Sequence, residues 1–389
     1  MPGSTRSYEM ARRLVENGHT VYMVTTKRDL YQIHKSNYTC EDGIHIFWLP
    51  VKYSNNMSFM RRILSFVTFS LLAVKQGNIF KADMIFATST PLTIAVPAIM
   101  LKKLKHIPLV FEVRDLWPEL PIAIGALKSK MIIYLAKKLE KMTYCYSTKI
   151  IALSNGMKKG ISRAGFPDSH ISVIPNFCDI KKFSIPKIEG IKFRNKFPWI
   201  GNNPLIVYCG AFGIINGVSY LVKVAAEMKK INKNICFLIM GEGKDKKTIR
   251  HIARQSDVLN KNFYMLDPIP KSDIPNLLSA ATIVTSLFID LKEMENNSAN
   301  KFFDGLAAGK PIMINYRGWQ KELLETNRAG IFVPFDKPQE GAKRLNDLIQ
   351  NKDRLKKYSH SAKQLAREKF SLEYLYNQFE LTLQKAAKW

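Results

Sequence analysis

The stretch SANKFFDGLAAGKPIMIN, residues 298–315, places three polar side chains within an otherwise apolar pattern. At about 100° per residue, Asn300, Lys301 and Asp304 fall on one side of a helix, while phenylalanine, leucine and alanine side chains fall on the other. A short apolar run follows the glycine and proline that end this pattern. The stretch therefore predicts an amphipathic helix that leads directly into a buried strand, which is the repeating unit of an α/β sheet.

The start of this predicted helix is also a candidate ligand site. Ser298 can cap the helix, and because strand candidates flank it, its N-terminus should open at the carboxyl edge of the sheet. Exposed amides there attract phosphate, Lys301 adds a positive charge, and Asp304 can accept hydrogen bonds from sugar hydroxyls. The same pattern, read by itself, more often belongs to a surface helix whose polar side chains face the solvent.

Strand-like apolar runs alternate with amphipathic helical runs along most of the chain, as in parallel sheets buried on both faces. A stretch rich in Pro, Gly, Asn and Lys, residues 183–204, separates two such series and indicates a linker. Two βα domains in series are the simplest interpretation, and residues 371–389 predict a final amphipathic helix. The predicted strands lie at residues 19–26, 82–89, 108–115, 148–154, 171–176, 205–213, 236–243, 262–270, 281–288, 311–316 and 329–335.

The composition narrows the class of protein and of partner. The chain has 389 residues, of which 46% are hydrophobic and 23% charged, as in globular proteins of more than one domain. Five scattered cysteines without CxxC spacing indicate reduced thiols in a cytoplasmic protein rather than disulfides or a zinc site. The net charge of +27 suits nucleic acid, anionic lipid or phosphorylated substrates. Nucleic acid is the weakest of these partners, because no zinc-finger, RNP-like or homeodomain pattern is present.

The N-terminal half contains sequence features of a membrane-surface protein. Its longest apolar runs, residues 63–74 and 91–101, fall short of the roughly 18 residues that a spanning helix needs. Residues 57–76 combine an apolar body with basic residues near the ends, as does a helix that lies in a membrane interface. The basic clusters LKKLKH and AKKLEK add charge in the same domain. A core helix fits residues 57–76 as well, so both interpretations stay open.

Two glycine-containing turns are candidates for phosphate binding. Residues 208–222 combine a strand, Gly210 and Gly213, and then a helix, so that backbone amides can approach a phosphate. Residues 238–249 form a second strand, glycine and helix turn that carries three lysines. Neither turn is a GxGxxG dinucleotide motif, and each also fits an ordinary connection between strand and helix.

Two carboxylates follow a predicted buried strand in the N-terminal half. In FEVRDLWPELP, residues 111–121, Asp115 and Glu119 lie beside Trp117 and two prolines. Acidic groups at the carboxyl end of a strand can act as a general base or bind an acceptor. The alternative is a structural turn with the tryptophan in the core.

Taken together, seven motifs resemble the family 4 glycosyltransferases of the GT-B fold over nearly the whole chain. The motifs are FEVRDLWPE, IALSNGMKKGI, VIPNFCDIKKF, YCGAFGIINGV, LIMGEGKDKKTI, IPKSDIPNLLSAATIVTSLF and SANKFFDGLAAGKPIMIN. They are most similar to the bacterial branch that builds O-antigen and capsule repeats, including the L-fucosamine (FucNAc) transferases. The resemblance implies an α/β protein of two Rossmann-like domains facing a cleft. It places an acceptor domain at residues 1–190, a nucleotide-sugar domain at 191–370, and a helix that crosses back to the first domain at 371–389.

The resemblance also implies a role for individual residues. The acidic residue before LAAGKP, Asp304, would bind the ribose of the nucleotide, with Asn300 and Lys301 facing the diphosphate or the sugar. The glycine turn would line the phosphates, and Ile269 would flank the base. No metal is implied, because amides and basic side chains stabilise the diphosphate leaving group in this family. The donor-binding residues implied are Gly210, Gly213, Lys247, Ile269, Asn300, Lys301 and Asp304.

The implied activity is transfer of a sugar with retention of its anomeric configuration. The donor would be a UDP-linked sugar, such as an N-acetylated amino-deoxysugar like FucNAc, and the acceptor a polyprenyl-diphosphate-linked glycan. The protein would lie in the cytoplasm, on the anionic inner face of the cytoplasmic membrane, and Asp115 and Glu119 would orient or deprotonate the acceptor. Two alternatives are a UDP-sugar epimerase of the same fold, which needs no lipid acceptor, and a truncated, non-catalytic binding protein.

The chain departs from the family pattern in two places at the donor site. The family has an acidic residue eight positions before the ribose-binding one, and here that position is Asn296, with Glu295 adjacent. Family members often carry Arg and Lys in the turn after the first strand of the second domain, where Ala211 and Asn216 stand here. Lys301 and the lysines at 244–247 would have to supply the missing charge.

A third departure concerns the start of the chain. The family's first strand and double-glycine loop would precede Ser4, where only Pro2 and Gly3 follow the initial methionine. We expect Gly3 and Ser4 to be the remnant of a phosphate loop, and the N-terminal sheet to lack its first strand. Loss of a central strand would expose the hydrogen-bonding groups of its neighbours.

Overall fold

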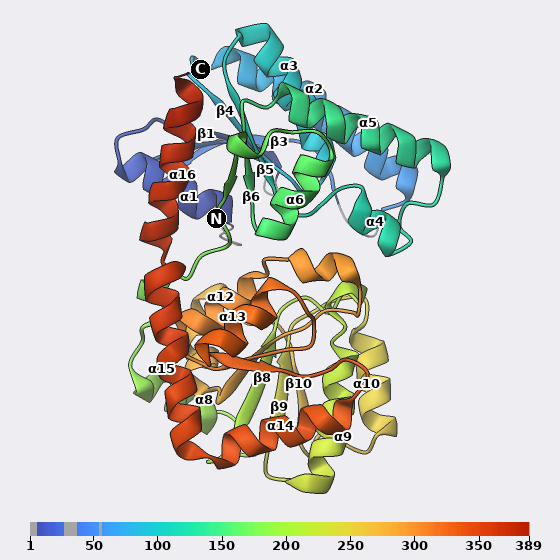
Figure 1. Ribbon diagram of the computed structural model, residues 1–389, viewed down its shortest axis with the longest axis vertical. Coiled ribbons are helices and arrows are strands. Elements are labelled where there is room, and N and C mark those ends of the chain that lie inside the picture. The colour runs from blue at the N-terminus through green and yellow to red at the C-terminus, as the bar shows by residue number, and fades with distance from the viewer. Residues whose placement is uncertain (1–5, 27–36, 54–56, 389) are drawn as a thin grey trace. The chain divides into compact units, whose positions relative to one another are not determined.

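The structure is a computed structural model that describes residues 6–26, 37–53 and 57–388, and the chain divides into two compact units. Unit 1 consists of Met1–Ile174 and Tyr376–Trp389, and unit 2 of Pro175–Leu375. In both units, parallel strands are flanked by helices (Figure 1). The predicted α/β class and the two Rossmann-like domains are therefore confirmed.

Unit 2 contains one six-stranded parallel sheet with the order β10-β9-β8-β11-β12-β13. Each strand lies within a run that the sequence predicts as a strand. From β8 the chain moves outward through β9 and β10 and then returns to place β11 on the other side of β8. The strand order reverses there, so the loops that follow β8 and β11 diverge at a topological switch point. The strands are β8 (Leu205–Cys209), β9 (Cys236–Met240), β10 (Phe263–Leu266), β11 (Ile283–Ser286), β12 (Ile312–Ile314) and β13 (Gly330–Phe332).

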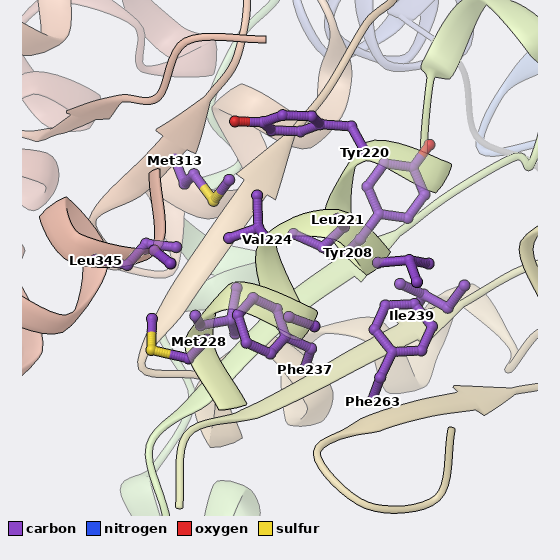
Figure 2. Packing of buried hydrophobic residues seen from close by; sticks show 14 of the residues in the cluster. Tyr208, Tyr220, Leu221, Val224, Met228, Phe237, Ile239, Phe263, Met313 and Leu345 are labelled. Atoms are coloured by element: carbon purple, nitrogen blue, oxygen red, sulfur yellow. The ribbon is translucent and has the colours of Figure 1, made fainter. Parts of the chain in front are cut away.

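Helices cover both faces of this sheet. On one face, α9 and α14 enclose a core in which Tyr208, Phe237 and Phe263 from the strands pack with Met228 and Leu345 (Figure 2). On the other face, α12 lies against β11 and α15 packs over α12. The helices of unit 2 are α7 (Ile180–Phe183), α8 (Lys187–Asn195), α9 (Ser219–Ile231), α10 (Lys246–Gln255), α11 (Ile274–Ala280), α12 (Asn300–Ala307), α13 (Trp319–Asn327), α14 (Pro338–Gln350) and α15 (Lys352–Lys369).

The predicted linker contains a helix, α8, so the prediction of irregular structure is wrong over this part of the stretch. Helix α8 is held against α11 by two contacts and not by an apolar stripe. A Cβ added at Gly190 would stand 2.8 Å from the backbone carbon of Ser279, so the two helices touch at their backbones. Arg194 donates from Nε and Nη2 to the carbonyl oxygen of Ala280 at 3.0 and 2.7 Å. These partners are distant in sequence, so helical periodicity does not reveal them.

Unit 1 contains two sheets in the described part of the chain, with the orders β1-β3-β2 and β4-β5-β6-β7. Neighbouring strands are parallel except for the antiparallel pair β2 and β3. Gly3 and Ser4 lie outside the described residues, so the expectation of a phosphate-loop remnant and a missing first strand stays a prediction. The strands are β1 (Tyr22–Thr26), β2 (Tyr38–Glu41), β3 (Ile44–Leu49), β4 (Ile85–Thr88), β5 (Leu109–Val113), β6 (Lys149–Ala152) and β7 (Ile171–Val173).

The hairpin of β2 and β3 is absent from the strands predicted above. Its turn consists of Asp42 and Gly43, whose φ angles are 50° and 77°, between the paired residues Glu41 and Ile44. An Asp-Gly pair with positive φ at both positions is typical of a two-residue β-hairpin. The dipeptide is therefore the sequence feature that would have predicted this hairpin.

The helices of unit 1 include one layer made by α2, α3 and α5, in which α3 packs against both of the others. The last helix, α16 (Leu372–Ala387), contributes its larger part to this unit, where Thr382 donates a hydrogen bond to Ser172 at 2.9 Å. No helix in the described ranges has the length and apolar character needed to span a bilayer. The other helices are α1 (Arg6–Glu16), α2 (Phe59–Ile79), α3 (Ala95–Lys105), α4 (Glu119–Ala123), α5 (Lys130–Tyr146) and α6 (Asn155–Arg163).

Candidate functional site

The loops that follow β8 and β11 meet at the switch point of unit 2. Ile289 donates its backbone N–H to the carbonyl oxygen of Ile215 at 2.9 Å and so ties the two loops together. Gly217 has a φ of 54°, and an added Cβ would lie 3.1 Å from the backbone of Phe288. Glycine at this position therefore allows the two loops to approach each other closely.

Lys301 supplies a positive charge at this junction. Its half-buried side chain donates from Nζ to the hydroxyl of Tyr208 at 2.9 Å and to Oδ1 of Asn216 at 2.7 Å. The Nζ atom also lies 4.6 Å from the centre of the Tyr208 ring. Both hydrogen-bond partners are neutral, and within the described residues no carboxylate pairs with this lysine. Burial without a counter-charge lowers the pKa of Lys301 to about 7.

This environment suits an anionic ligand. An ammonium group that donates two hydrogen bonds keeps one N–H for a further acceptor. Lys301 is the second residue of α12, and the N-cap residue Ala299 provides no side-chain cap for the first amides of that helix. A phosphate placed there would receive hydrogen bonds from the helix start and would supply the counter-charge that Lys301 lacks.

Asp304 lies one turn further along α12 and is half-buried, as is Lys301. Burial raises the pKa of its carboxyl to about 7, although Lys182 and Lys271 act in the opposite direction. The thiol of Cys209, at the end of β8, has a pKa raised to about 11 by burial and by the Asp304 charge, while Lys301 lowers it. The charges of Asp304 and Lys301 therefore both influence Cys209 at the end of β8, which agrees with their predicted position on one polar side of the helix.

The predicted glycine turn lies beside Lys301. A Cβ added at Gly210 would stand 3.5 Å from Cε and 3.7 Å from Nζ of Lys301. Gly213 adjoins Asn216, whose amide nitrogen would lie 3.5 Å from an added Cβ. The structure thus brings Gly210, Gly213, Lys301 and Asp304 to one end of β8. It also adds Tyr208 and Asn216, which the sequence did not suggest as partners of the lysine.

The loops after β8 and β9 are joined by backbone contacts that support this turn. Gly210 donates its N–H to Met240 at 3.0 Å, and Phe212 donates to Glu242 at 2.9 Å. Gly241 has a φ of 153°, and a Cβ added there would stand 1.9 Å from the carbonyl oxygen of Gly210. The position of the glycine turn that follows β8 therefore depends on the absence of a side chain at Gly241.

Gly241→Ala is expected to destabilise the protein by about 2 kcal/mol or more, because the added methyl group collides with backbone and the φ angle is unfavourable for alanine. Urea unfolding of the variant measures this loss. Gly18→Ala is the matched control, since Gly18 also has a positive φ of 86° but has no atom within 4 Å of an added Cβ. Equal losses in the two variants would contradict the proposed collision.

The other predicted donor residues lie further from this group. Asn300 is exposed at the first position of α12, Lys247 is exposed in the first turn of α10, and Ile269 is half-buried in the loop after β10. All three follow carboxyl ends of strands in the same parallel sheet. In the described structure, no hydrogen bond or ion pair joins any of them to Lys301 or Asp304.

Two expectations about charge and capping are corrected. Lys246, one of the lysines expected to compensate, is neutralised by Glu242 and Asp267, each with an oxygen 2.6 Å from Nζ. Ser298 does not cap α12: its Oγ accepts the backbone N–H of Asn176 at 3.0 Å, and Ala299 is the N-cap residue. Ser298 is engaged by a residue 122 positions away in sequence, whereas Lys246 is paired both with Glu242, four positions before it, and with Asp267, 21 positions after it.

The family has an acidic residue eight positions before the ribose-binding one, and among the described residues of unit 2 no carboxylate near that position forms a hydrogen bond to Lys301. Asn296 ends the short helical turn Lys292–Asn296, ahead of α12. Glu295 contacts Gly318, where a Cβ would lie 2.2 Å from its carbonyl oxygen. The structure therefore places the backbone of Glu295 against the loop after β12 and gives its carboxylate no hydrogen bond to Lys301.

The second candidate site lies at the carboxyl ends of β4 and β5 in unit 1. Oδ2 of Asp115 accepts a hydrogen bond from Thr90 at 3.2 Å, and the backbone N–H of Arg114 donates to Oγ of Ser89 at 2.9 Å. Burial raises the pKa of Asp115, whereas the Arg114 charge and the Thr90 hydrogen bond lower it. Asp115 is thus a partly buried carboxylate held at the edge of the sheet, as expected for a group that binds or deprotonates a hydroxyl.

A buried ion pair lies beside this edge. Arg6 of α1 donates from Nε to Oε1 of Glu112 at 2.7 Å and from Nη2 to the carbonyl oxygen of Ile174 at 2.9 Å. The other oxygen of Glu112 accepts a hydrogen bond from Thr88 at 2.7 Å. The network joins α1 to the ends of β4, β5 and β7 and so stiffens the part of the sheet that presents Asp115.

Glu119 is exposed at the start of α4 and has no hydrogen bond to Asp115. Its charge acts on Glu140 of α5, a buried carboxylate that accepts a hydrogen bond from the hydroxyl of Tyr144 at 3.1 Å. Burial, with a smaller contribution from Glu119, raises the pKa of Glu140 to about 7. The sequence did not indicate Glu140 because it stands within a cluster of lysines.

Glu140→Gln is expected to stabilise the protein at pH 8 by about 2 kcal/mol and to have a much smaller effect at pH 5. Folding raises the pKa of this acid, so the unfolded chain loses its proton first and stability falls as the pH rises from about 4.5 to about 7. Thermal unfolding at the two pH values measures the difference. Glu322→Gln, an exposed glutamate on α13, is the control, and an equal effect at both pH values would contradict the account.

Comparison with known families covers nearly the whole chain. Residues 3–182 match the family described as Glycosyltransferase Family 4, and residues 191–365 match the family described as Glycosyl transferases group 1. The boundary between the matches falls near the start of unit 2. The switch-point turn, Lys301 and Asp304 all lie within the second match.

Relatives with curated sequences share about a fifth of their residues with this chain. The putative colanic acid biosynthesis glycosyl transferase WcaI of Escherichia coli is 22% identical over 272 residues, which are 66% of each chain. The uncharacterized glycosyltransferase MJ1069 of Methanocaldococcus jannaschii is 21% identical over 248 residues, 63% of this chain and 60% of that one. The chain thus spans about two thirds or less of the length of these relatives.

Solved structures with a similar fold cover almost all of the chain. Anabaena Alr3699/HepE in complex with UDP and glucose has a TM-score of 0.75 at 16% identity, over 97% of this chain and 94% of that one. Sucrose-phosphate synthase (tll1590) from Thermosynechococcus elongatus has a TM-score of 0.80 at 13% identity, over 97% and 92%. With a family 4 domain, a group 1 domain and two Rossmann-like units, the chain belongs to the glycosyltransferases of the GT-B fold.

Proposed function

We propose that the protein is a retaining glycosyltransferase that moves a sugar from a UDP-linked donor to a polyprenyl-diphosphate-linked glycan. The donor sugar would be an N-acetylated amino-deoxysugar such as FucNAc, and the product a repeat unit of O-antigen or capsule. The motif resemblance supports the branch, and the similar fold of HepE, described with UDP and glucose, supports the nucleotide. The acceptor class places the reaction on the inner face of the cytoplasmic membrane.

The observation that carries this proposal is the environment of Lys301. A half-buried ammonium group with only neutral partners lies at the switch point of a parallel sheet, next to Gly210 and the uncapped start of α12. Open α/β sheets bind ligands at such a point. A diphosphate supplies both the negative charge and the oxygen acceptors that this arrangement lacks, whereas a neutral ligand supplies no charge.

The reaction assigns a task to each group. The bond between the anomeric carbon and the diphosphate oxygen breaks, and the electron pair leaves with UDP. Lys301 and the amides of α12 stabilise the negative charge that develops on the leaving diphosphate. The acceptor hydroxyl oxygen forms the new bond to the anomeric carbon, and Asp115 takes its proton, with Glu119 orienting the acceptor. Asp304 accepts hydrogen bonds from the ribose and so fixes the position of the nucleotide relative to Lys301.

A panel of UDP- and GDP-sugars, incubated with and without a lipid-diphosphate acceptor, tests the proposed activity. Release of UDP that depends on the acceptor, together with a glycosylated lipid, is the expected result. Interconversion of the sugar without acceptor would identify an epimerase instead. Binding of the nucleotide without either reaction would identify a non-catalytic binding protein, and both of these outcomes would overturn the proposal.

Asp304→Asn is expected to weaken UDP binding roughly 10- to 100-fold, because a hydrogen bond to a charged acceptor contributes about 1.5–3 kcal/mol. Binding of inorganic pyrophosphate should stay unchanged, since the ribose is the group that Asp304 would contact. Calorimetric titration with both ligands measures the two affinities. Asp347→Asn, an exposed carboxylate on α14, is the matched control, and equal weakening of pyrophosphate binding by Asp304→Asn would contradict the ribose assignment.

A further inference from the structure

The outer face of the layer formed by α2, α3 and α5 carries an unusual number of exposed apolar side chains. More than half of the exposed large hydrophobic residues of the described chain lie on these three helices. Five of the six on α2 are Met60, Ile63, Leu64, Val67 and Leu71, with 40–71% of each residue exposed, and the sixth is Ile79 at the end of the helix. Their spacing of three and four residues places all five on one side of the helix. This stripe points away from the core of unit 1 and is open to solvent.

The neighbouring helix α5 repeats the pattern. Met131, Tyr134, Leu135 and Met142 are exposed, by 69%, 66%, 53% and 40%, and also share one side of their helix. Between α2 and α5, helix α3 adds Leu104, which is 58% exposed. Because α3 packs against both other helices, these side chains belong to one continuous layer. Both α2 and α5 contact α3, and the three helices belong to unit 1 (Figure 1).

The charges on the same three helices are almost all positive. Helix α2 carries Arg61, Arg62 and Lys75, helix α3 carries three lysines, and helix α5 carries four. The one carboxylate on the three helices is Glu140, which is 6% exposed and bonded to Tyr144. The outer face therefore combines apolar side chains with ammonium and guanidinium groups, and it presents no exposed carboxylate.

This combination favours a lipid surface over a protein partner. Lysine is depleted in the buried parts of protein interfaces, whereas here the four lysines of α5 lie along one edge of its apolar stripe or within it. At a bilayer, the apolar side chains enter the acyl boundary and the long basic side chains reach the headgroups. The absence of acidic groups from the face matches a surface made of negatively charged lipids.

We propose that the outer face of α2, α3 and α5 docks unit 1 onto an anionic bilayer, with the α2 and α5 stripes inserted at the level of the headgroups. The inference rests on the proposed function only in that a lipid-linked acceptor gives the docking a purpose. Docking would hold the acceptor-binding unit at the surface where polyprenyl-linked glycans are found. Residues 1–200 hold 30 Lys/Arg against 13 Asp/Glu, and docking accounts for this excess of positive charge as a lipid-binding feature.

Co-sedimentation with vesicles tests the face directly. The full-length protein is mixed with vesicles of phosphatidylethanolamine and phosphatidylglycerol, and separately with vesicles of phosphatidylcholine alone. Binding to the anionic vesicles that weakens with added salt, and little binding to phosphatidylcholine, is the expected result. Failure to bind the anionic vesicles, or equal binding to both kinds, would overturn the proposal.

Paired variants test whether vesicle binding depends on the apolar side chains of this face or on exposed apolar side chains anywhere on the protein. Leu64→Gln with Leu71→Gln should weaken vesicle binding at least about tenfold, because two inserted leucines are lost. The matched control, Ile188→Gln with Ile191→Gln, removes two isoleucines of unit 2 that are each 50% exposed and should leave binding unchanged. Equal weakening by both pairs, or by neither, would overturn the assignment of the face.

A second pair of variants tests the contribution of the lysines of α5 to vesicle binding. Lys137→Gln, Lys138→Gln and Lys141→Gln together should weaken binding roughly 100-fold, since each basic residue near an anionic surface contributes about a factor of five. The control replaces three exposed lysines of α15 in the same way: Lys352, Lys356 and Lys357. A variant of α5 that binds vesicles as the natural protein does would contradict the proposal.

Two further measurements distinguish a loss of membrane docking from a loss of donor binding and from dimerisation. UDP affinity in solution should be the same in all of these variants, so a loss of vesicle binding with UDP binding intact concerns docking alone. Light scattering of the natural protein without lipid should show a monomer. A dimer that Leu64→Gln with Leu71→Gln dissociates would identify the face as a contact between two copies and would overturn the lipid assignment.

Discussion

Replacing Lys301 by methionine is expected to lower turnover roughly 100- to 1,000-fold, the range for removal of a group that stabilises charge in a transition state. The ligand-free variant should at the same time be more stable at pH 7. Folding lowers the pKa of Lys301 from its ordinary value to about 7, so the buried ammonium group opposes folding. This opposition is fully present below pH 7 and disappears as the pH rises toward 10.5, the ordinary value.

Steady-state release of UDP and thermal unfolding at pH 7 and pH 10 measure the two effects. Lys223→Met, an exposed lysine on α9, is the control and should change neither turnover nor stability appreciably. A loss of turnover together with a gain of stability distinguishes a functional charge from a structural one. A Lys301→Met protein that is both active and less stable would show that the lysine serves the fold through Tyr208 and Asn216.

The second large effect is expected at Asp115. Asp115→Asn should lower turnover roughly 100-fold or more, as loss of a general base does, and leave UDP binding unchanged. Burial raises the pKa of this carboxyl above its ordinary value, so turnover of the natural protein should rise with pH through a pKa above that value. The acid limb of the pH profile should be absent from the residual activity of the variant.

Asp83→Asn provides the comparison, because Asp83 is an exposed carboxylate of the same unit. Turnover and UDP affinity of this control should match those of the natural protein. If Asp115→Asn turns over normally, the assignment of the base is wrong. If it loses UDP affinity in proportion to turnover, the residue supports the fold or the donor site and does not deprotonate the acceptor.

Strands buried on both faces could be predicted from the sequence because their apolar runs are continuous and end in glycine, proline or polar residues. All six strands of unit 2 and five of the seven in unit 1 lie within such runs. The hairpin of β2 and β3 has mixed polarity, and only the Asp42 and Gly43 turn signals it. Helix α8 could not be predicted because it lacks an apolar stripe. Backbone contact at Gly190 and hydrogen bonds from Arg194 hold it against α11 instead.

At the proposed donor site, the sequence predicted which side of α12 carries the polar groups, but not what these groups contact. Lys301 and Asp304 could be identified from helical spacing and from the family motif. Their neighbours Tyr208 and Asn216 lie 93 and 85 residues away from the lysine in sequence. The contact arises because the strand order places β8 next to β11, which no local pattern encodes.

The same contact gives a physical meaning to one departure from the family pattern. Family members often carry a basic residue where Asn216 stands, and here the amide oxygen of Asn216 accepts a hydrogen bond from Lys301 at 2.7 Å. The positive charge therefore comes to the glycine turn from α12, across the switch point. We expect Lys301 to carry more of the phosphate binding in this protein than a lysine that shares the task with a basic turn.

A crystal structure with UDP bound would show whether Lys301 and α12 hold the diphosphate. The β-phosphate should lie with an oxygen about 2.7–3.1 Å from Nζ of Lys301 and close to the first amides of α12, with the ribose hydroxyls on the carboxylate of Asp304. UDP bound elsewhere on the chain, with Lys301 still joined only to Tyr208 and Asn216, would contradict the assignment of the donor site.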